Sequence, residues 1–316
     1  MSSKLCDIFI GIVMSLEKHI LFLSFILIAA NASAGEIAFT FDDAPTSNSA
    51  VMSGMERSKT IIAALEESKI EDVLFFVTSK NINAEGRERL DLYAKSGFHI
   101  ANHTHSHRSA NQLDPHEFMV DVYQAHLVIK EYDNALPYFR FPYLHYGPSE
   151  VTISFIQESL SELGYRNGYI TIDNFDWYIN SALNKARESG KKIEYKKLEQ
   201  LYVSVIWSGI KFYDDLAKKV LNRSPKHILL LHENDTSALF LPALAKHIRD
   251  KGWSIISPQE AYTEPIANRL PNTLFHKQGR IAALAHEAGI KAENLRHPSE
   301  NEKFLDSLLE QSGVFQ

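Results

Sequence analysis

The chain has 316 residues, which is enough for one large domain or two ordinary ones, and its 45% hydrophobic and 23% charged residues exclude a disordered chain. The formal net charge is -6 and no basic block stands out, so a nucleic-acid partner is not expected. The single cysteine, Cys6, excludes an internal disulfide and a thiolate zinc site, so any bound metal must use histidine and carboxylate ligands.

The first segment in chain order has the pattern of a secretory signal. An apolar run at Ile20–Ala30 follows Lys18 and is too short to span a bilayer, which needs about 20 residues. Ala32-Ser33-Ala34 then supplies an A-x-A cleavage pattern. Residues 1–34 are therefore predicted to be a signal peptide, and the alternatives are a buried N-terminal helix and an uncleaved anchor.

Cleavage after Ala34 is the first testable prediction. The exported protein, whether periplasmic or secreted, is expected to begin at Gly35 by N-terminal sequencing. Translation from Met1 or from Met14 leads to the same mature chain, which would have no cysteine and no stable membrane span. A mature protein that retains Ile20–Ala30 would instead be anchored.

Short apolar runs rich in β-branched or aromatic residues alternate with segments of helical period. This alternation predicts an α/β fold with a parallel sheet, and seven units favour a distorted, incomplete (β/α) barrel of about seven parallel strands. No G-x-G-x-x-G or Walker A pattern follows any run, so a nucleotide cofactor is not expected. The expected strands lie near Ile37–Phe41, Val73–Val77, Phe98–Ala101, Tyr138–Phe141, Gly168–Ile172, Ile228–Leu231 and Trp253–Ile256.

The alternation stops after Pro258. Two helical stretches follow, Ile281–Ala288 and Phe304–Leu309. The barrel is therefore predicted to occupy residues 35–262, and residues 263–316 are predicted to form a helical C-terminal extension packed on it. A disordered or partner-binding tail is the alternative.

Polar side chains follow several of the expected strands, where the chemistry of such folds is located. The first strand leads into Asp42-Asp43, which would also suit a turn before Pro45. The third leads into His103 and His107, whose spacing lets one turn of backbone aim both at one metal ion, whereas His105 is expected to point away.

Three further strands end in polar residues of catalytic type. Arg140 lies at the end of the fourth strand, Asp176 follows the fifth, and His232 follows three leucines at the end of the sixth. Each of these residues alone is weak evidence, because a lone buried histidine is usually a satisfied core residue. Their shared position at one rim predicts a catalytic site.

At this level the sequence resembles the NodB-like polysaccharide deacetylases, carbohydrate esterase family 4. Five segments carry the resemblance in order, namely T-F-D-D-A-P, H-T-H-S-H, R-F-P-Y, D-N-F-D-W and L-L-L-H, within roughly residues 36–258. The resemblance implies a distorted (β/α) barrel that removes N-acetyl or O-acetyl groups from sugars with a divalent metal, most commonly zinc, with cobalt or nickel as alternatives.

The resemblance also implies roles for the first three motifs. Asp43, His103 and His107 would bind the metal. Asp42 would be the base that activates water, and Arg140 would orient it. Two histidines and one carboxylate leave open positions on zinc, as the chemistry of hydrolysis requires.

The last motifs would supply the proton and the substrate contacts. Tyr143 would offer its backbone N–H to the developing oxyanion, and Trp177 would pack beside the site. His232 would be the acid that protonates the departing amine, with Asp176 tuning it.

The sequence departs from the family pattern at three places. Ala44 stands where glycine is usual, Leu144-His145-Tyr146 precede Gly147 where glycine usually follows the aromatic residue directly, and Glu233 stands where aspartate is common. None removes a catalytic group, but the second changes a loop at the rim and bears on substrate preference.

The leading hypothesis is thus an enzyme, a metal-dependent deacetylase of N-acetylglucosamine-containing glycans such as peptidoglycan, chitin oligomers or an exopolysaccharide. One alternative is an amidohydrolase acting on a small amide or imide. A non-haem iron oxygenase is a second alternative, because two histidines and one carboxylate also bind Fe(II). A non-catalytic glycan-binding relative is the last, and it would not need Asp42, Arg140, Asp176 or His232.

Overall fold

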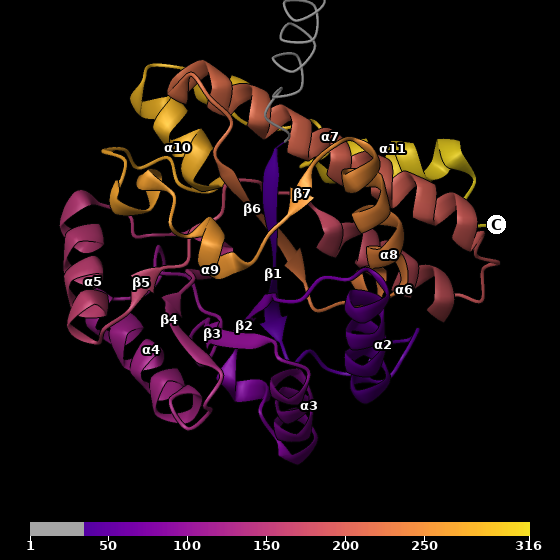
Figure 1. Cartoon of the computed structure of the whole chain (residues 1–316), viewed down its shortest axis with the longest axis horizontal. Coiled ribbons are helices and arrows are strands. Elements are labelled where there is room, and N and C mark those ends of the chain that lie inside the picture. Colours follow the sequence, from indigo (N-terminus) through magenta and orange to yellow (C-terminus); the bar gives the residue numbers. More distant parts are fainter. Residues whose placement is uncertain (1–34) are drawn as a thin grey trace, which may run out of the picture. The chain divides into compact units, whose positions relative to one another are not determined.

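The computed structural model describes residues 35–316, so the predicted signal peptide and its cleavage site lie outside the described residues apart from Gly35. Its centre is a sheet of seven parallel strands (Figure 1). The strands are β1 (Glu36–Ala44), β2 (Leu74–Val77), β3 (His99–Asn102), β4 (Ala135–Phe139), β5 (Arg166–Asn167), β6 (Lys226–His232) and β7 (Ser254–Ile255).

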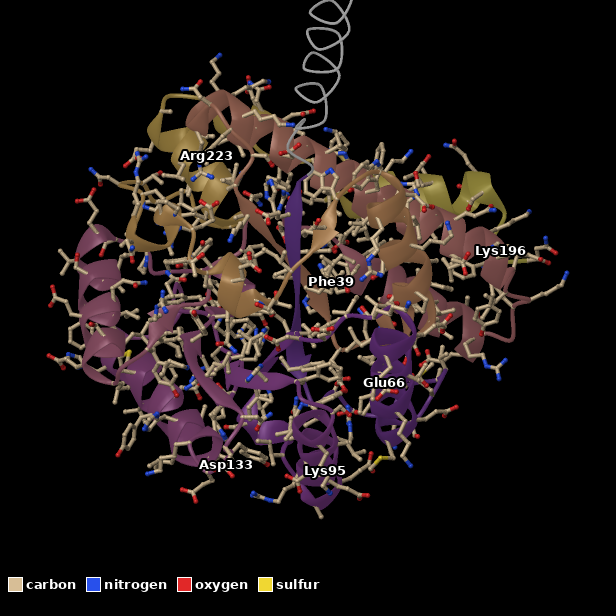
Figure 2. The ribbon with its side chains drawn as sticks, viewed as in Figure 1. Phe39, Glu66, Lys95, Asp133, Lys196 and Arg223 are labelled. Atoms are coloured by element: carbon tan, nitrogen blue, oxygen red, sulfur yellow. The ribbon has the colours of Figure 1, made fainter. Side chains whose placement is uncertain are left out.

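β1 lies at the centre of the fold, with β2 on one side and β6 on the other (Figure 1). The strand order is β5-β4-β3-β2-β1-β6, and β7 pairs with the start of β1. Phe39 of β1 is fully buried, and Figure 2 labels it in the middle of the molecule while Lys95, Asp133 and Lys196 lie at the periphery. The predicted incomplete (β/α) barrel is therefore confirmed.

Helices connect consecutive strands and cover the sheet, and several begin at the capping residues that their sequences provide. The side chains of Ser53, Asn83, Asp114, Ser149 and Asn234 each accept a hydrogen bond from a backbone N–H of the first turn. The α-helices are α2 (Gly54–Glu67), α3 (Ala84–Lys95), α4 (Pro115–Ile129), α5 (Glu150–Glu162), α6 (Asp176–Glu188), α7 (Tyr195–Leu221), α8 (Asp235–Asp250), α9 (Pro258–Ala261), α10 (Gly279–Glu287) and α11 (Glu302–Ser312). Short 3₁₀ turns lie at Ser79–Asn81, Pro142–Leu144, Pro265–Asn268 and Ala292–Asn294.

Two strands differ from their predicted positions, and both differences trace to the site. β4 ends at Phe139, because Arg140 turns into the interior and Pro142 then begins a 3₁₀ turn. The predicted strand at Gly168–Ile172 is wrong in position. β5 covers only Arg166–Asn167, the carbonyl of Gly168 accepts from Arg140 Nε at 2.8 Å, and Ile172 forms a single parallel bridge to Leu229 of β6.

The predicted helical extension is present as α10 and α11. Figure 1 shows α10 beside the long helix α7, and α11 contacts α6 and α7. Apolar side chains of the extension are buried in the same hydrophobic cluster as the core of the sheet, among them Ile281, Leu284, Leu305 and Leu309. Across residues 35–316, no helix combines the length and hydropathy needed to cross a membrane.

Glu233 connects the end of β6 to the loop after β1, to α3 and, through a hydrogen bond from Ser58 Oγ at 3.1 Å, to α2. It is fully buried, and its carboxylate accepts from the Thr46 backbone N–H at 2.6 Å, from Tyr93 Oη at 2.6 Å and from Arg89 Nη2 at 2.5 Å. These contacts fix the loop that follows Asp42-Asp43. Glutamate at this position, where the sequence departs from the family pattern, thus has a positioning role.

Arg89→Ala should therefore destabilise the protein by about 3–5 kcal/mol, because it leaves a buried carboxylate without its cation. Chemical denaturation of wild type and variant measures the change. Lys246→Ala is the matched control, since Lys246 pairs with Asp250 on the exposed surface of α8 and should change stability little. Equal stabilities for all three proteins would contradict this account of Glu233.

Candidate active site

The site is built at the carboxyl ends of the central strands. Asp42 at the end of β1 is the register partner of His232 at the end of β6. Neighbouring strands lie roughly 5 Å apart, so these two residues face the same rim although 190 positions separate them in sequence. Asp43 follows with φ 71°, and this left-handed turn directs its side chain differently from that of Asp42.

Asp43, His103 and His107 form a cluster able to hold a metal ion. Asp43 Oδ1 lies 3.2 Å from His107 Nε2 and 3.6 Å from His103 Nε2. Ligand atoms bound to one tetrahedral zinc at about 2.0–2.1 Å lie roughly 3.3 Å apart, so both separations suit a common ion. Asp43 Oδ1 is buried without a hydrogen-bond partner. Buried polar atoms normally have a partner, and a bound cation would be one for this oxygen.

The environment of His103 prepares it as a ligand. Its Nδ1 lies 2.8 Å from the Arg140 carbonyl, which can only accept, so Nδ1 carries the proton and Nε2 is free to bind a metal. Burial, assisted by the charge of His107, lowers the pKa of His103 to about 3. The imidazole is therefore neutral at neutral pH. His105 Nδ1 instead lies 2.9 Å from Ser79 Oγ, away from the cluster.

Arg140 holds Asp42 beside the metal cluster. Its Nη1 donates to Asp42 Oδ1 at 2.5 Å and to Thr40 Oγ1 at 2.9 Å. Its Nη2 donates to Tyr262 Oη at 3.2 Å, and the guanidinium stacks over Phe76, with Cζ 3.8 Å from the ring centroid. Arg140 is fully buried, so these contacts fix both it and the free oxygen of Asp42, which lies 3.7 Å from His103 Nε2.

Asp176, the first residue of α6, holds His232 across the rim. Asp176 Oδ1 lies 2.6 Å from His232 Nδ1, while Oδ2 accepts from the His232 backbone N–H at 2.9 Å and from Asn234 Nδ2 at 3.0 Å. Burial opposes charge on His232, but the charge and hydrogen bond of Asp176 outweigh it, with help from Asp43 and Asp42, and raise the pKa of His232 to about 10. His232 is thus an imidazolium at neutral pH.

One cavity of about 430 Å³ is lined by the metal cluster, by Asp42 and by His232. Two aromatic residues that the sequence placed at the site stand at its mouth, because Tyr143 is 57% exposed and Trp177 is 39% exposed. The Tyr143 ring also packs edge-on against His107. All nine predicted site residues therefore lie at or beside this cavity, and Asp176 and Arg140 reach it through His232 and Asp42.

Backbone strain is concentrated here as well. Within residues 35–316, seven residues other than glycine have positive φ, and five of them belong to the loops that carry the site. Such conformations persist where surrounding contacts enforce them, and they are common at functional sites. The five are Asp43, Thr104, His107, Tyr143 and Leu144.

Other contributors were not predicted from the sequence. Tyr262 supports Arg140, and Asn234 supports Asp176, through single hydrogen bonds. Lys277, Gln278 and Arg296 of the C-terminal extension line the cavity. Asn234 directly follows the L-L-L-H segment and Glu233, but no motif surrounds the other four residues, so only the folded chain brings those four to the rim.

A comparison with family models matches residues 29–167 to the polysaccharide deacetylase family. The matched stretch includes the Asp42-Asp43, histidine and Arg140 motifs and ends before Asp176 and His232. No curated protein matches the sequence.

Solved structures of family 4 carbohydrate esterases resemble the fold at low identity. A pseudoenzyme of that family from Bacillus anthracis is 12% identical, with a TM-score of 0.51 over 72% of this chain and 66% of that chain. A Streptomyces lividans esterase solved with acetate is 17% identical, covering 72% and 95% of the two chains at a TM-score of 0.48. A Bacillus subtilis peptidoglycan deacetylase is 19% identical, covering 73% and 93% at 0.47. The resemblance indicated by the five motifs is therefore confirmed, since residues 29–167 match the polysaccharide deacetylase family and the chain has the fold of a family 4 carbohydrate esterase.

Proposed function

We propose that the protein is a metal-dependent hydrolase that removes N-acetyl groups from an N-acetylglucosamine-containing glycan. The observation that carries the proposal is the pairing of a fixed carboxylate, Asp42, with a charged histidine, His232, on adjacent strands beside an Asp-His-His cluster. Asp43, His103 and His107 would hold the metal. Their nitrogen and oxygen donors suit zinc, and Co²⁺ or Ni²⁺ are the alternatives. When bound, the metal supplies Lewis acidity that polarises the acyl carbonyl and acidifies the attacking water.

Asp42 is assigned as the general base. Arg140 occupies one of its oxygens, which leaves the other to take a proton from water as the water attacks the acetyl carbon. Tyr143 sits on the strained 3₁₀ turn after Arg140, and its backbone N–H is proposed to stabilise the negative charge that develops on the acyl oxygen.

His232 is assigned as the general acid. Its Nδ1 proton is held by Asp176, so Nε2 can donate the second proton to the sugar nitrogen as the C–N bond breaks. The products are acetate and a free amine on the sugar. Asp42 and His232 are register partners on neighbouring strands, so the base and the acid are close enough to act on one acyl group.

The mouth of the cavity favours a sugar over a small amide or imide. Tyr143 and Trp177 expose aromatic faces at the rim, where a sugar ring extending out of the cavity would contact them. A small imide would be enclosed in the cavity and would leave both rings in water. Peptidoglycan, chitin oligomers and exopolysaccharides are the proposed glycan classes, and a periplasmic or secreted location is proposed from the N-terminal pattern.

Acetate release from a panel of substrates tests the proposal. Oligomers of N-acetylglucosamine, peptidoglycan strands and a small cyclic imide are each incubated with metal-loaded protein. Release from a glycan but not turnover of the imide is expected. Imide hydrolysis alone would favour the amidohydrolase, and glycan binding without any release would place the protein with the non-catalytic relatives.

A further inference from the structure

The C-terminal extension forms part of the wall of the catalytic cavity. Lys277 and Gln278 lie just before α10, and Arg296 lies between α10 and α11, and all three line the cavity that contains Asp42, Asp43 and His232. The extension is therefore positioned to contact whatever the site binds, although it follows the barrel in sequence.

This wall is fixed in place. Gly279 packs against Ile170 with φ 82°, and a Cβ atom there would lie 2.8 Å from the Ile170 backbone oxygen, so only glycine fits. The next backbone N–H, that of Arg280, donates to the same Ile170 oxygen at 2.7 Å. On the other side, His276 stacks on Tyr146, with 4.5 Å between ring centroids. The rim loop that departs from the family pattern is thus in contact with the extension.

The wall presents two cations to the cavity. Lys277 is exposed and forms no ion pair or hydrogen bond with any residue that the structure describes. Lys277 lines the cavity together with His145, and burial and the Lys277 charge both lower the pKa of His145. The Arg296 side chain is 48% exposed and its Nε lies 3.8 Å from Oε2 of the buried Glu300. Its Nε and Nη2 also face the side-chain oxygen of Gln278, so Nη1 is the guanidinium nitrogen left for a ligand.

The acidic groups around the cavity leave the charge of Lys277 uncompensated. Asp42 is paired with Arg140, and Asp43 belongs to the metal cluster. Asp173 also lines the cavity, and burial, together with the charge of Glu300, raises the pKa of Asp173 well above its usual value. Because Glu300 pairs with Arg296, the uncompensated positive charge of this wall is that of Lys277.

We propose that Lys277 and Arg296 bind a carboxylate that the glycan carries close to its acetylated sugar. The preferred substrate is then an acidic glycan, whose carboxylate belongs either to a uronic acid or to a lactyl ether on an amino sugar. Arginine and lysine both bind carboxylates through charge-assisted hydrogen bonds. This inference rests on the proposed function, because it names the substrate class of the same site.

The test compares kcat/KM for three oligosaccharides, a neutral N-acetylglucosamine oligomer, an alternating N-acetylglucosamine–glucuronate oligomer and an N-acetylmuramic acid-containing strand. At least one acidic substrate is expected to exceed the neutral one by about tenfold at low salt, and the ratio should fall as salt screens the charges. Lys277→Ala should remove most of this ratio and Lys277→Glu should invert it. Lys291→Ala, which removes another exposed lysine of the extension, should leave the ratio unchanged.

Binding of the same oligosaccharides to Asp42→Asn protein, measured by calorimetry, separates the two proposals. Turnover of the neutral oligomer with equal or better kinetics than both acidic ones would overturn the carboxylate inference while the deacetylase proposal stands. Acidic oligosaccharides that bind through Lys277 but release no acetate with wild-type protein would support the inference and overturn the deacetylase. Equal binding of neutral and acidic oligosaccharides would overturn the inference whether or not acetate is released.

Discussion

Asp42→Asn is expected to lower kcat by about 10²–10⁴-fold while the protein still binds one metal ion, because the change removes the base and leaves the Asp43, His103 and His107 ligands in place. The shape is preserved, since Arg140 keeps its hydrogen bonds to Thr40 and to the Gly168 carbonyl. Acetate release and metal content, measured on the same sample, give the two numbers.

Asp42→Asn is expected to lose activity and keep the metal, whereas substitution of a histidine ligand is expected to lose both. His107→Ala should abolish tight metal binding and turnover together, since it removes one of three protein ligands. His105→Ala is the matched control from the same segment, because His105 contacts Ser79 and not the cluster. If His105→Ala lost metal as completely as His107→Ala, the ligand assignment would be wrong.

His232→Ala is expected to cost about 10²–10⁴-fold in rate, the usual contribution of a positioned general acid. The loss should be smaller for an O-acetyl ester, because an alkoxide is a better leaving group than an amine. The rate should also depend on pH. His232 acts as an imidazolium, so activity is present below its pKa and is lost as pH rises through it, and without metal the charge of Asp176 raises this pKa, against burial, to about 10. A bound cation near Asp43 opposes the raised pKa, so in the metal-loaded enzyme the alkaline limb lies below it.

Asp176→Asn separates a tuning role from a purely structural one. The amide retains a partner for Asn234 and for the His232 backbone but removes the negative charge that stabilises the imidazolium. The pKa of His232 should therefore fall, and the alkaline limb should move to lower pH, with metal content unchanged. A limb that stays in place in both Asp176→Asn and His232→Ala would show that the proton comes from another group.

The parts of this site that the sequence predicts are those that follow strands. Asp42, His103, Arg140 and His232 each lie at or just after the end of a strand, and parallel strands bring their carboxyl ends to one rim. Pairing of β1 with β6 could not be read from the sequence, because strand order depends on long-range packing. That pairing alone makes Asp42 and His232 neighbours.

The segment from Gly168 to Ile172 shows why a correct apolar pattern can be placed in the wrong element. Its residues are buried as in a strand, but the Gly168 carbonyl accepts from Arg140 and the chain crosses to Leu229 of β6. The hydrogen bond to the buried Arg140 guanidinium thus takes the place of further pairing with β4. Periodicity records burial and carries no information about such a partner.

The C-terminal extension contains site residues that the sequence pattern did not predict. The helical period predicts α10 and α11, yet the cavity residues Lys277 and Arg296 lie outside the two helices. Their position depends on Gly279 packing against Ile170 and on the contact of His276 with Tyr146. Exposed basic residues are common in any sequence, so only their place on the folded chain distinguishes these two.

A metal titration of acetate release tests the central claim most directly. Metal-free protein is mixed with increasing zinc in the presence of an N-acetylglucosamine oligomer or the preferred acidic glycan, and initial rates are recorded. The account predicts no release without metal, a linear rise, and a break at one ion per chain, as a single Asp43-His103-His107 cluster requires. Full activity in the metal-free protein, or a rise with no break at one equivalent, would contradict it.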